Sequence, residues 1–180
     1  MIAESPDYRL IESLLSPSEA HTLLEGLKSS VDWDTSMKAR MTACYGESYD
    51  ESGVEFTPRP MLSKLIPICK SIKATLGFRP TNCLLNFYAN GKSTMGFHSD
   101  TISYLEPETG IAIVSLGAER DLTFRNKENY DLRQTVPMPD GSLFYMTQET
   151  QNHWTHAVKK AQTDAPRISL TFRRILSERK

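Results

Sequence analysis

The stretch that decides the fold is NCLLNFYANGKSTMGFHSD, residues 82–100. It begins as an apolar strand, passes through the turn Asn90-Gly91 and ends at the triplet His98-Ser99-Asp100. Because side chains alternate between the two faces of a strand, His98 and Asp100 point the same way and Ser99 points away. The triplet therefore predicts an imidazole and a carboxylate that can reach one metal ion.

A second imidazole has to come from far along the chain. The segment QNHWTHAVKK, residues 151–160, offers His153 and His156. Two imidazoles and one carboxylate on one face of an octahedron, with three positions open, are the ligand set of non-haem Fe(II) oxygenases. The two histidines are an odd number of residues apart, so on a regular strand they would face opposite sides.

Two arginines follow on one predicted strand, PRISLTFR, residues 166–173. Arg167 and Arg173 are separated by an even number of residues, so both face the same side as Ser169 and Thr171. Buried guanidinium groups need anions, because an unpaired buried charge is costly. A dicarboxylate cosubstrate would supply two.

Composition sets the broad class. The chain has 180 residues, of which 39% are hydrophobic, which suits one globular domain. Its net charge is −1, so any contact with nucleic acid must rest on a local basic patch. The cysteines, Cys44, Cys69 and Cys83, lack metal or redox spacing and favour reduced thiols. The sequence shows no secretory signal and no apolar run of membrane-spanning length, so we expect a cytoplasmic monomer, or a nuclear one in a eukaryote.

The pattern of elements is helical first and strand-rich afterwards. The box Ser16-Pro17-Ser18-Glu19 predicts a helix up to about Ser30. A second helix is expected over 62–76, ending at Gly77, and residues 31–60 between the two look irregular. Eight short strands, typical of a sandwich or jelly roll, are expected at 82–88, 94–98, 111–117, 120–126, 132–137, 142–146, 154–158 and 166–174.

The motifs HSD, NHWTH and PRISLTFR together resemble the AlkB family of Fe(II)/2-oxoglutarate-dependent dioxygenases. The stretches LLNFYANGKSTMGFHSD and IAIVSLGAERDLTFRNK also look like the family's nucleic-acid-repair branch, and the resemblance covers roughly residues 40–174. It implies an α+β, mainly β fold: a double-stranded β-helix (jelly-roll) core with N-terminal helices packed on it. We expect one domain, 1–180, with helices and substrate-lid loops in 1–80 and the jelly-roll core in 81–175.

The resemblance also implies the site, with Fe(II), 2-oxoglutarate and O2 as cofactors. It assigns the metal to His98, Asp100 and His156, because the family's ligand follows a bulky pair as His156 does. Contacts to 2-oxoglutarate carry over to Asn86, Tyr88, Arg167, Ser169 and Arg173. We expect Arg167, Ser169 and Tyr88 at the distal carboxylate. Arg173 and Asn86 are expected nearer the metal, although the roles of the two arginines are interchangeable at this stage.

The implied activity is oxidative dealkylation of N-alkylated nucleobases in DNA or RNA, as in alkylation damage repair. Hydroxylation of an N-methyl group would release formaldehyde and the free base, while 2-oxoglutarate becomes succinate and CO2. Such an enzyme extrudes the base and stacks it against the first histidine, here His98, with Tyr45 or Tyr49 as the aromatic partner. Candidate phosphate contacts are Lys38, Arg40, Arg120, Arg125, Lys127, Lys159 and Lys160.

Two departures from the family pattern bear on the substrate. The most similar repair enzymes have an acidic residue directly after the metal-binding aspartate, whereas this chain has Thr101 at that position. The loop at 34–40 is also short for a hairpin that opens duplexes. Both favour single-stranded substrates or lesions other than the usual cationic bases. The alternatives are an oxygenase of a protein side chain or small molecule, and a non-catalytic jelly-roll binding module, which would not need the complete ligand and arginine sets.

Overall fold

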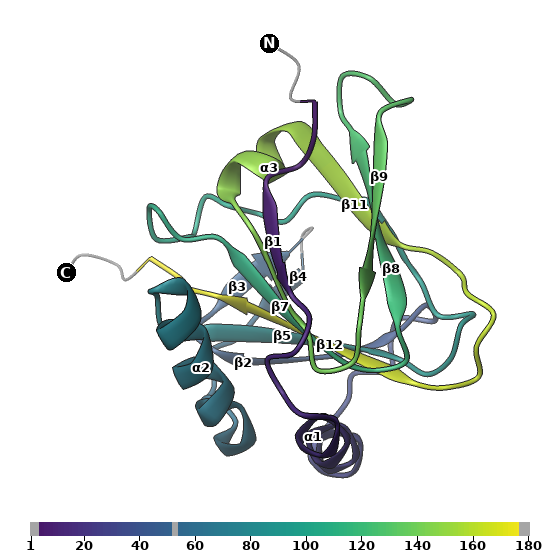
Figure 1. The fold of residues 1–180 in the computed structure, drawn as a ribbon. Coiled ribbons are helices and arrows are strands. Elements are labelled where there is room, and N and C mark those ends of the chain that lie inside the picture. The colour runs from purple at the N-terminus through teal and green to yellow at the C-terminus, as the bar shows by residue number, and fades with distance from the viewer. Residues whose placement is uncertain (1–3, 52–53, 177–180) are drawn as a thin grey trace.

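The computed structural model describes residues 4–51 and 54–176 (Figure 1). The elements in chain order are β1 (Tyr8–Ile11), α1 (Pro17–Ser30), β2 (Met41–Gly46), β3 (Tyr49–Glu51), β4 (Val54–Phe56), η1 (Ser63–Leu65), α2 (Ile66–Leu76), β5 (Asn82–Tyr88), β6 (Met95–His98), β7 (Ile111–Gly117), β8 (Arg120–Asn126), β9 (Arg133–Met138), β10 (Leu143–Met146), α3 (Gln148–His153), β11 (Trp154–Val158) and β12 (Arg167–Arg173).

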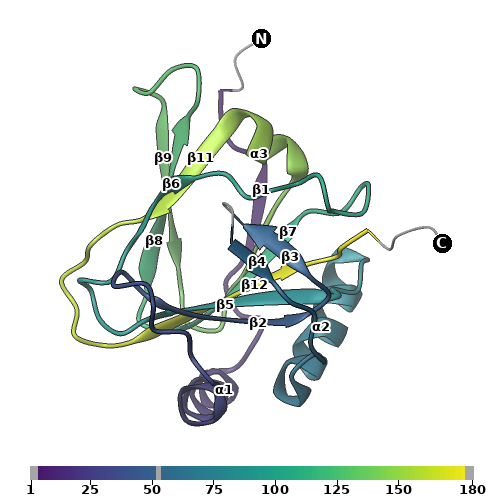
Figure 2. The ribbon, with the colours of Figure 1, turned by 180° about the vertical axis from the view of Figure 1, so that it is seen from behind.

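Two antiparallel sheets form the body of the molecule. The larger has six strands in the order β1-β10-β7-β12-β5-β2, and the smaller has four in the order β6-β11-β8-β9. A separate hairpin, β3-β4, lies near the carboxyl end of β12 and is seen in front of it in the view from behind (Figure 2). This is the expected mainly β, jelly-roll architecture.

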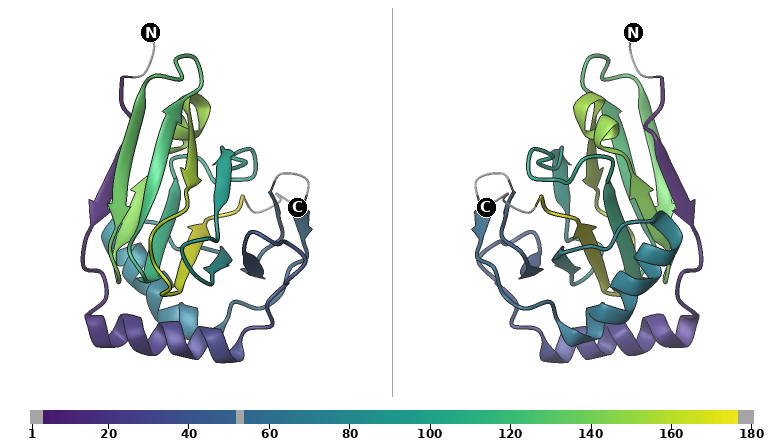
Figure 3. Two further views of the ribbon diagram at one scale, coloured as in Figure 1. Left: turned by 90° about the vertical axis from the view of Figure 1, so that its right-hand side faces the viewer. Right: turned by 90° about the vertical axis from the view of Figure 1, so that its left-hand side faces the viewer.

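Helices α1 and α2 cover the outer face of the six-stranded sheet (Figure 3). Helix α1 crosses the base of the molecule, with α2 beside it (Figure 3). Leu24 and Leu27 of α1 and Ile72 of α2 pack with sheet residues such as Leu85 and Leu170 in one apolar core. Burying both faces of this sheet explains why β12 has no exposed residue along its whole length.

A second apolar core fills the space between the two sheets. It joins Ile113 and Phe144 of the larger sheet to Leu122, Phe124 and other side chains of the smaller one. Both strand partners of β12, β5 and β7, present their inward residues to this space. The polar groups that lie among these apolar side chains therefore face a region shielded from water.

Local signals set the ends of both helices. Ser16 caps α1 and accepts from the backbone of Glu19, whose carboxylate accepts in return from the backbone of Ser16 at 2.8 Å. Helix α2 has its proline near the first turn and ends at Gly77, which adopts a φ of 86° that glycine tolerates best. No helix in the described part of the chain is long and apolar enough to cross a membrane.

The eight predicted strands and both predicted helices are present, within a residue or two at the ends and with the first turn of the second helix formed by η1. The expectation that residues 31–60 are irregular is wrong, because β2 pairs with β5 over its whole length and β3 pairs with β4. Strand β1 and helix α3 were also not predicted. The larger sheet takes β1 and β2 from the N-terminal part, so it does not follow the expected division at residue 80.

Candidate metal centre and cosubstrate pocket

Neighbouring strands bring the three predicted metal ligands together. His98 ends β6 and pairs directly with His156 of β11, and Asp100 follows two residues after His98. Nε2 of His98 lies 3.3 Å from Oδ1 of Asp100, and Nε2 of His156 lies 3.5 Å from the same oxygen. Among the described residues, only these three form such a group, with ligand atoms within 4.8 Å of one another.

Hydrogen bonds orient two of these ligands. Nδ1 of His98 lies 2.9 Å from the carbonyl oxygen of Gly96, so a proton on Nδ1 is donated there and the Nε2 lone pair is left for a metal. The backbone N–H of Asp100 donates to Oε1 of Gln151 at 2.9 Å. The ring of His156 packs 5.9 Å from that of Phe124, centroid to centroid. The donor set and its supports therefore fit a divalent ion.

The two oxygens of the Asp100 carboxylate have different partners, and Arg173 binds one of them. Its Nη2 donates to Oδ2 at 2.6 Å, while Oδ1 faces the two histidines. Burial opposes ionisation of Asp100, but the Arg173 guanidinium and the contacts with His156 and His98 outweigh it and hold the pKa of this carboxyl well below its usual range. Burial also lowers the pKa of His156. At neutral pH the group is thus a carboxylate with a neutral imidazole, the form that binds a metal.

Arg167 lies further along the same face of β12 and has different neighbours. Its Nε donates to Oγ of Ser115 at 2.9 Å, and its guanidinium lies 5.4 Å from the ring centre of Tyr88. Burial lowers its pKa to about 10, so it remains charged at neutral pH. Nη1 is buried and has no hydrogen-bond partner within the described chain. A buried cationic nitrogen without an anion fits the distal carboxylate of 2-oxoglutarate.

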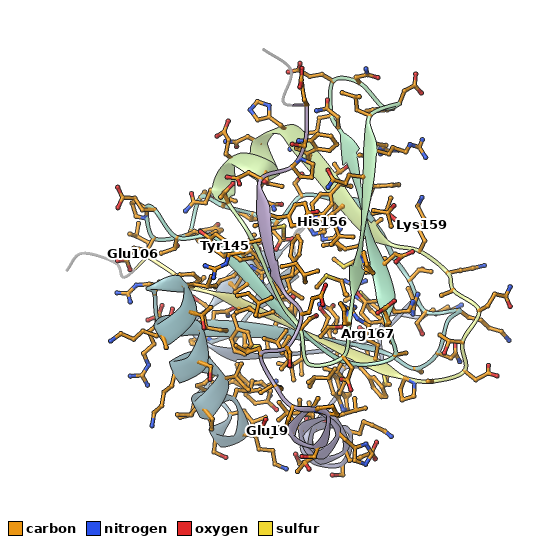
Figure 4. The ribbon with its side chains drawn as sticks, viewed as in Figure 1. Glu19, Glu106, Tyr145, His156, Lys159 and Arg167 are labelled. Carbon is orange, nitrogen blue, oxygen red and sulfur yellow. The ribbon has the colours of Figure 1, made fainter. Side chains whose placement is uncertain are left out.

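The remaining cosubstrate candidates line the same pocket. Ser169 is paired with Asn86 on one side and Ser115 on the other, so the three face the same space. Figure 4 shows His156 and Arg167 inside the molecule, between the sheets. The side chains lining the pocket are Asn86, Tyr88, Met95, His98, Asp100, Ile113, Leu122, Met138, His156, Val158, Arg167, Ser169, Thr171 and Arg173.

Strand register refines the expected position of Asn86. It lies beside Ser169, whereas the strand neighbour of Arg173 is Asn82, which donates to the carbonyl oxygen of Glu47 at 2.7 Å. Oδ1 of Asn86 accepts from Nε of Arg40 at 2.7 Å. Arg40, predicted to contact substrate, is therefore anchored at the pocket.

The other predicted substrate contacts divide into two groups. Tyr49 and Thr101 lie beside the metal site: the Tyr49 hydroxyl donates to the Thr101 carbonyl at 3.4 Å, and the Tyr49 ring lies 4.0 Å under Arg173. Tyr49 is only 2% exposed, so it presents no open stacking surface. The prediction for Tyr45 is wrong, because it is paired with Cys83 on the opposite face of the sheet and belongs to the helix-side core.

Two further predictions can be compared with the structure. Arg120 is buried and donates to the backbone carbonyls of Asn90, Ser93 and Lys159, so it is not available to a phosphate. His153 ends α3 and lies 2.7 Å from Glu149, away from the metal ligands, as expected of a residue outside the ligand set.

Sequence reasoning missed two residues of the site. Ser115 is a lone hydroxyl in the apolar run IAIVSLG, and that contrast was a usable signal. Gln151 accepts from the backbone N–H of Asp100 and lies in the short helix α3, which the sequence did not predict.

Comparison with known proteins agrees with this geometry. The family model of the 2OG-Fe(II) oxygenase superfamily matches residues 7–173, a longer stretch than the resemblance noted in the motifs. DNA oxidative demethylase ALKBH2 of Homo sapiens is 30% identical over 190 residues, which cover 93% of this chain and 73% of the relative. Alpha-ketoglutarate-dependent dioxygenase alkB homolog 3 of Homo sapiens is 32% identical over 190 residues, covering 92% of this chain and 65% of the relative.

A solved structure shares the fold. The structure of OsALKBH1 superimposes with a TM-score of 0.71, covering 94% of this chain and 99% of that one, at 14% sequence identity. At that identity the likeness concerns the arrangement of strands and helices.

Proposed function

The chain belongs to the AlkB family within the 2OG-Fe(II) oxygenase superfamily, and from that premise we propose that it removes alkyl groups from N-alkylated nucleobases in single-stranded DNA or RNA. It is an Fe(II)- and 2-oxoglutarate-dependent dioxygenase. The observation that carries the proposal is the joint presence of the His98, Asp100 and His156 cluster and the buried Arg167 in one pocket.

The assignment of roles follows from the contacts. Iron held by His98, Asp100 and His156 would supply the oxidation of a substrate C–H bond coupled to decarboxylation of 2-oxoglutarate to succinate. Arg173 keeps Asp100 ionised and leaves Oδ1 for the metal. Arg167, held by Ser115, would bind the distal carboxylate and so orient the cosubstrate.

The walls of the pocket would exclude water from the reaction. Ile113, Leu122, Met138 and Val158 contribute apolar side chains around the polar groups. A dry site strengthens the electrostatic contacts to the cosubstrate and protects reactive species from side reactions. The chain therefore provides geometry, charge and shielding, and the bound groups provide the oxidation.

The preference for single strands is supported by the loop before β2. Asp34 and Thr42 exchange backbone hydrogen bonds of 2.8 and 3.0 Å, which closes the loop between them. The carbonyl of Ala39 accepts from the backbone of Thr94 at 3.2 Å, and Arg40 bonds to Asn86. This short loop is held at its base and again at Ala39 and Arg40, which supports the proposed preference for single strands.

The relatives favour nucleic acid as the substrate class. One is named a DNA oxidative demethylase, and it aligns with 93% of this chain. Thr101 would then change which damaged base is accepted, since it replaces an expected acidic neighbour of the metal-binding aspartate. Thr101→Asp should shift the enzyme towards cationic bases; an unchanged substrate profile would remove Thr101 as a determinant.

The test is mass spectrometry of short N-methylated oligonucleotides, single- and double-stranded, incubated with protein, Fe(II), ascorbate and 2-oxoglutarate. We expect loss of the methyl group mainly from single strands. His98→Ala should abolish it, and His153→Ala, a change at a histidine outside the cluster, should not. Succinate formation without any change in the oligonucleotides would instead indicate a protein or small-molecule substrate.

A further inference from the structure

The outer face of the four-stranded sheet carries a stack of aromatic and cationic side chains that the metal site does not use. The guanidinium of Arg125 lies 4.1 Å from the ring centre of Phe97 and 4.5 Å from that of Tyr130. Nζ of Lys159 lies 5.6 Å from the Phe97 ring centre. We call Phe97, Arg125 and Tyr130 the outer stack.

Strand alternation places the outer stack on the side of the sheet opposite the metal. Phe97 immediately precedes His98 on β6, and Arg125 immediately follows the core residue Phe124 on β8. Strand β11 lies between β6 and β8, and it presents Thr155 to this outer side as the strand partner of Arg125. One sheet thus separates the outer stack from the candidate metal ligands.

Tyr130 is the most exposed large hydrophobic side chain in the described chain. It is 60% exposed, with Arg125 against one face of its ring. Its backbone carbonyl accepts from Nε of Arg133 at 3.0 Å, which helps to hold the turn between β8 and β9. A ring that is held by a cation and still largely exposed is positioned to stack on a planar group.

The outer stack is also close to a route out of the pocket. Strand β6 is an edge strand of its sheet, with β11 as its single neighbour in the described structure. A nucleic-acid strand with one base at His98 would need to pass only round this edge to reach Phe97 and Tyr130.

We propose that the outer stack is a second binding surface for single-stranded nucleic acid, and this inference rests on the proposed function. Tyr130 would stack on a base that flanks the one in the pocket, and Arg125 and Lys159 would approach the adjoining phosphates. Aromatic rings combined with cations are the usual platform for single strands, because every base has a face to stack.

Neighbouring charges determine which interaction dominates. Lys127 and Arg133 are exposed in or beside the turn that carries Tyr130, but so are Glu128 and Asp131. The carboxylates offset part of the positive potential, so the outer stack should act mainly through base stacking. Its contribution to affinity should therefore depend little on salt, unlike that of phosphate contacts.

The test measures binding of a fluorescein-labelled, unmodified single-stranded 12-mer by anisotropy at low and high salt. We expect Tyr130→Ala to weaken binding about tenfold at both salt concentrations. Tyr130→Phe, which keeps the ring, should bind as the unaltered protein does. Tyr104→Ala is the matched control, because Tyr104 is also exposed, at 46%, but lies outside the outer stack.

A second measurement separates this inference from the proposed function. A methylated mononucleotide has no flanking base to stack on Tyr130, so Tyr130→Ala should demethylate it at the unaltered rate. If the unaltered protein demethylates oligonucleotides but Tyr130→Ala binds the 12-mer as tightly, only the outer stack is wrong. If the unaltered protein neither binds nor demethylates any oligonucleotide, the proposed function fails and this inference fails with it.

Discussion

Arg167 and Arg173 face the same side of β12, and both are almost completely buried, but their surroundings differ. Arg173 is paired within the chain, with Nη2 2.6 Å from the Asp100 carboxylate. Arg167 has a hydroxyl and an aromatic face as neighbours, and no carboxylate pairs with it among the described residues. The charge of Arg173 is thus paired within the folded protein, whereas that of Arg167 would be paired by the proposed cosubstrate. The two arginines are similarly buried, but because their partners differ, their mutation should have different effects.

The largest effect on stability is expected from breaking the internal pair. Arg173→Met leaves the buried Asp100 carboxylate uncompensated, so the free energy of unfolding of the metal-free protein should fall by about 3–5 kcal/mol in urea denaturation. Arg174→Met is the control, since Arg174 pairs with Glu106 where both side chains are more than a third exposed, at 37% and 36%. Equal stability of Arg173→Met and the unaltered protein would contradict the pairing.

The reverse pattern is expected at the other arginine. Arg167→Met removes a buried charge that has no internal anion, so stability should be unchanged or higher. Its affinity for 2-oxoglutarate, titrated by calorimetry into the Mn(II)-loaded protein, should fall by about 100-fold or more. Arg133→Met, at an exposed arginine, should leave the affinity unchanged. A strong loss of stability in Arg167→Met would mean that this cation also serves the fold.

A smaller effect should come from the residue that orients Arg167. Ser115→Ala removes the hydroxyl that accepts from Nε at 2.9 Å. A single hydrogen bond of this kind contributes about 1 kcal/mol, so 2-oxoglutarate should bind about fivefold more weakly in the same titration. Ser142→Ala is a suitable control, because Ser142 is equally buried and its hydroxyl has no hydrogen-bond partner in the described chain.

Acid unfolding of the metal-free protein should distinguish the two arginines without a measurement of activity. The pKa of Asp100 is held below its ordinary value of 3.8, so the unfolded chain takes up its proton first. The stability from this carboxylate is present in full above pH 3.8 and is lost as the pH falls through the folded pKa. Arg167→Met should therefore show the same acid-dependent loss as the unaltered protein in pH-dependent denaturation. A weaker dependence of the free energy of unfolding on pH in Arg167→Met would indicate that a carboxylate pairs with Arg167.

The sequence predicted the strands well because their hydrophobic runs are bounded by clear turns. It failed where pairing with distant segments decides the structure. Residues 41–46, MTACYG, form a strand because they pair with β5, and the short β1 exists because it pairs with β10 far along the chain. Local propensity carries no information about either partner.

The candidate site shows the same limit. His98, Asp100 and the two arginines could be predicted because their residue types and spacing reflect metal and carboxylate chemistry. The choice of His156 over His153 rested on the family resemblance. The prediction for Tyr45 failed because residues 41–46 were not recognised as a strand. Without the strand, the alternation of side chains that points Tyr45 towards the helices could not be predicted. Gln151 was missed because its contact depends on where α3 folds back towards Asp100.

Because His98 pairs directly with His156, the metal-binding group depends on the register of β6 and β11. These strands have an irregular register just beyond this point, between His156 and Val158, so sliding of β6 is not blocked by a long regular ladder. A slip of one residue would turn His98 outwards and Phe97 inwards, and the metal-binding group would be lost. An ion bound by both histidines would thus fix the register of β6 against β11. Retention of metal through purification would then report that the two strands are correctly aligned.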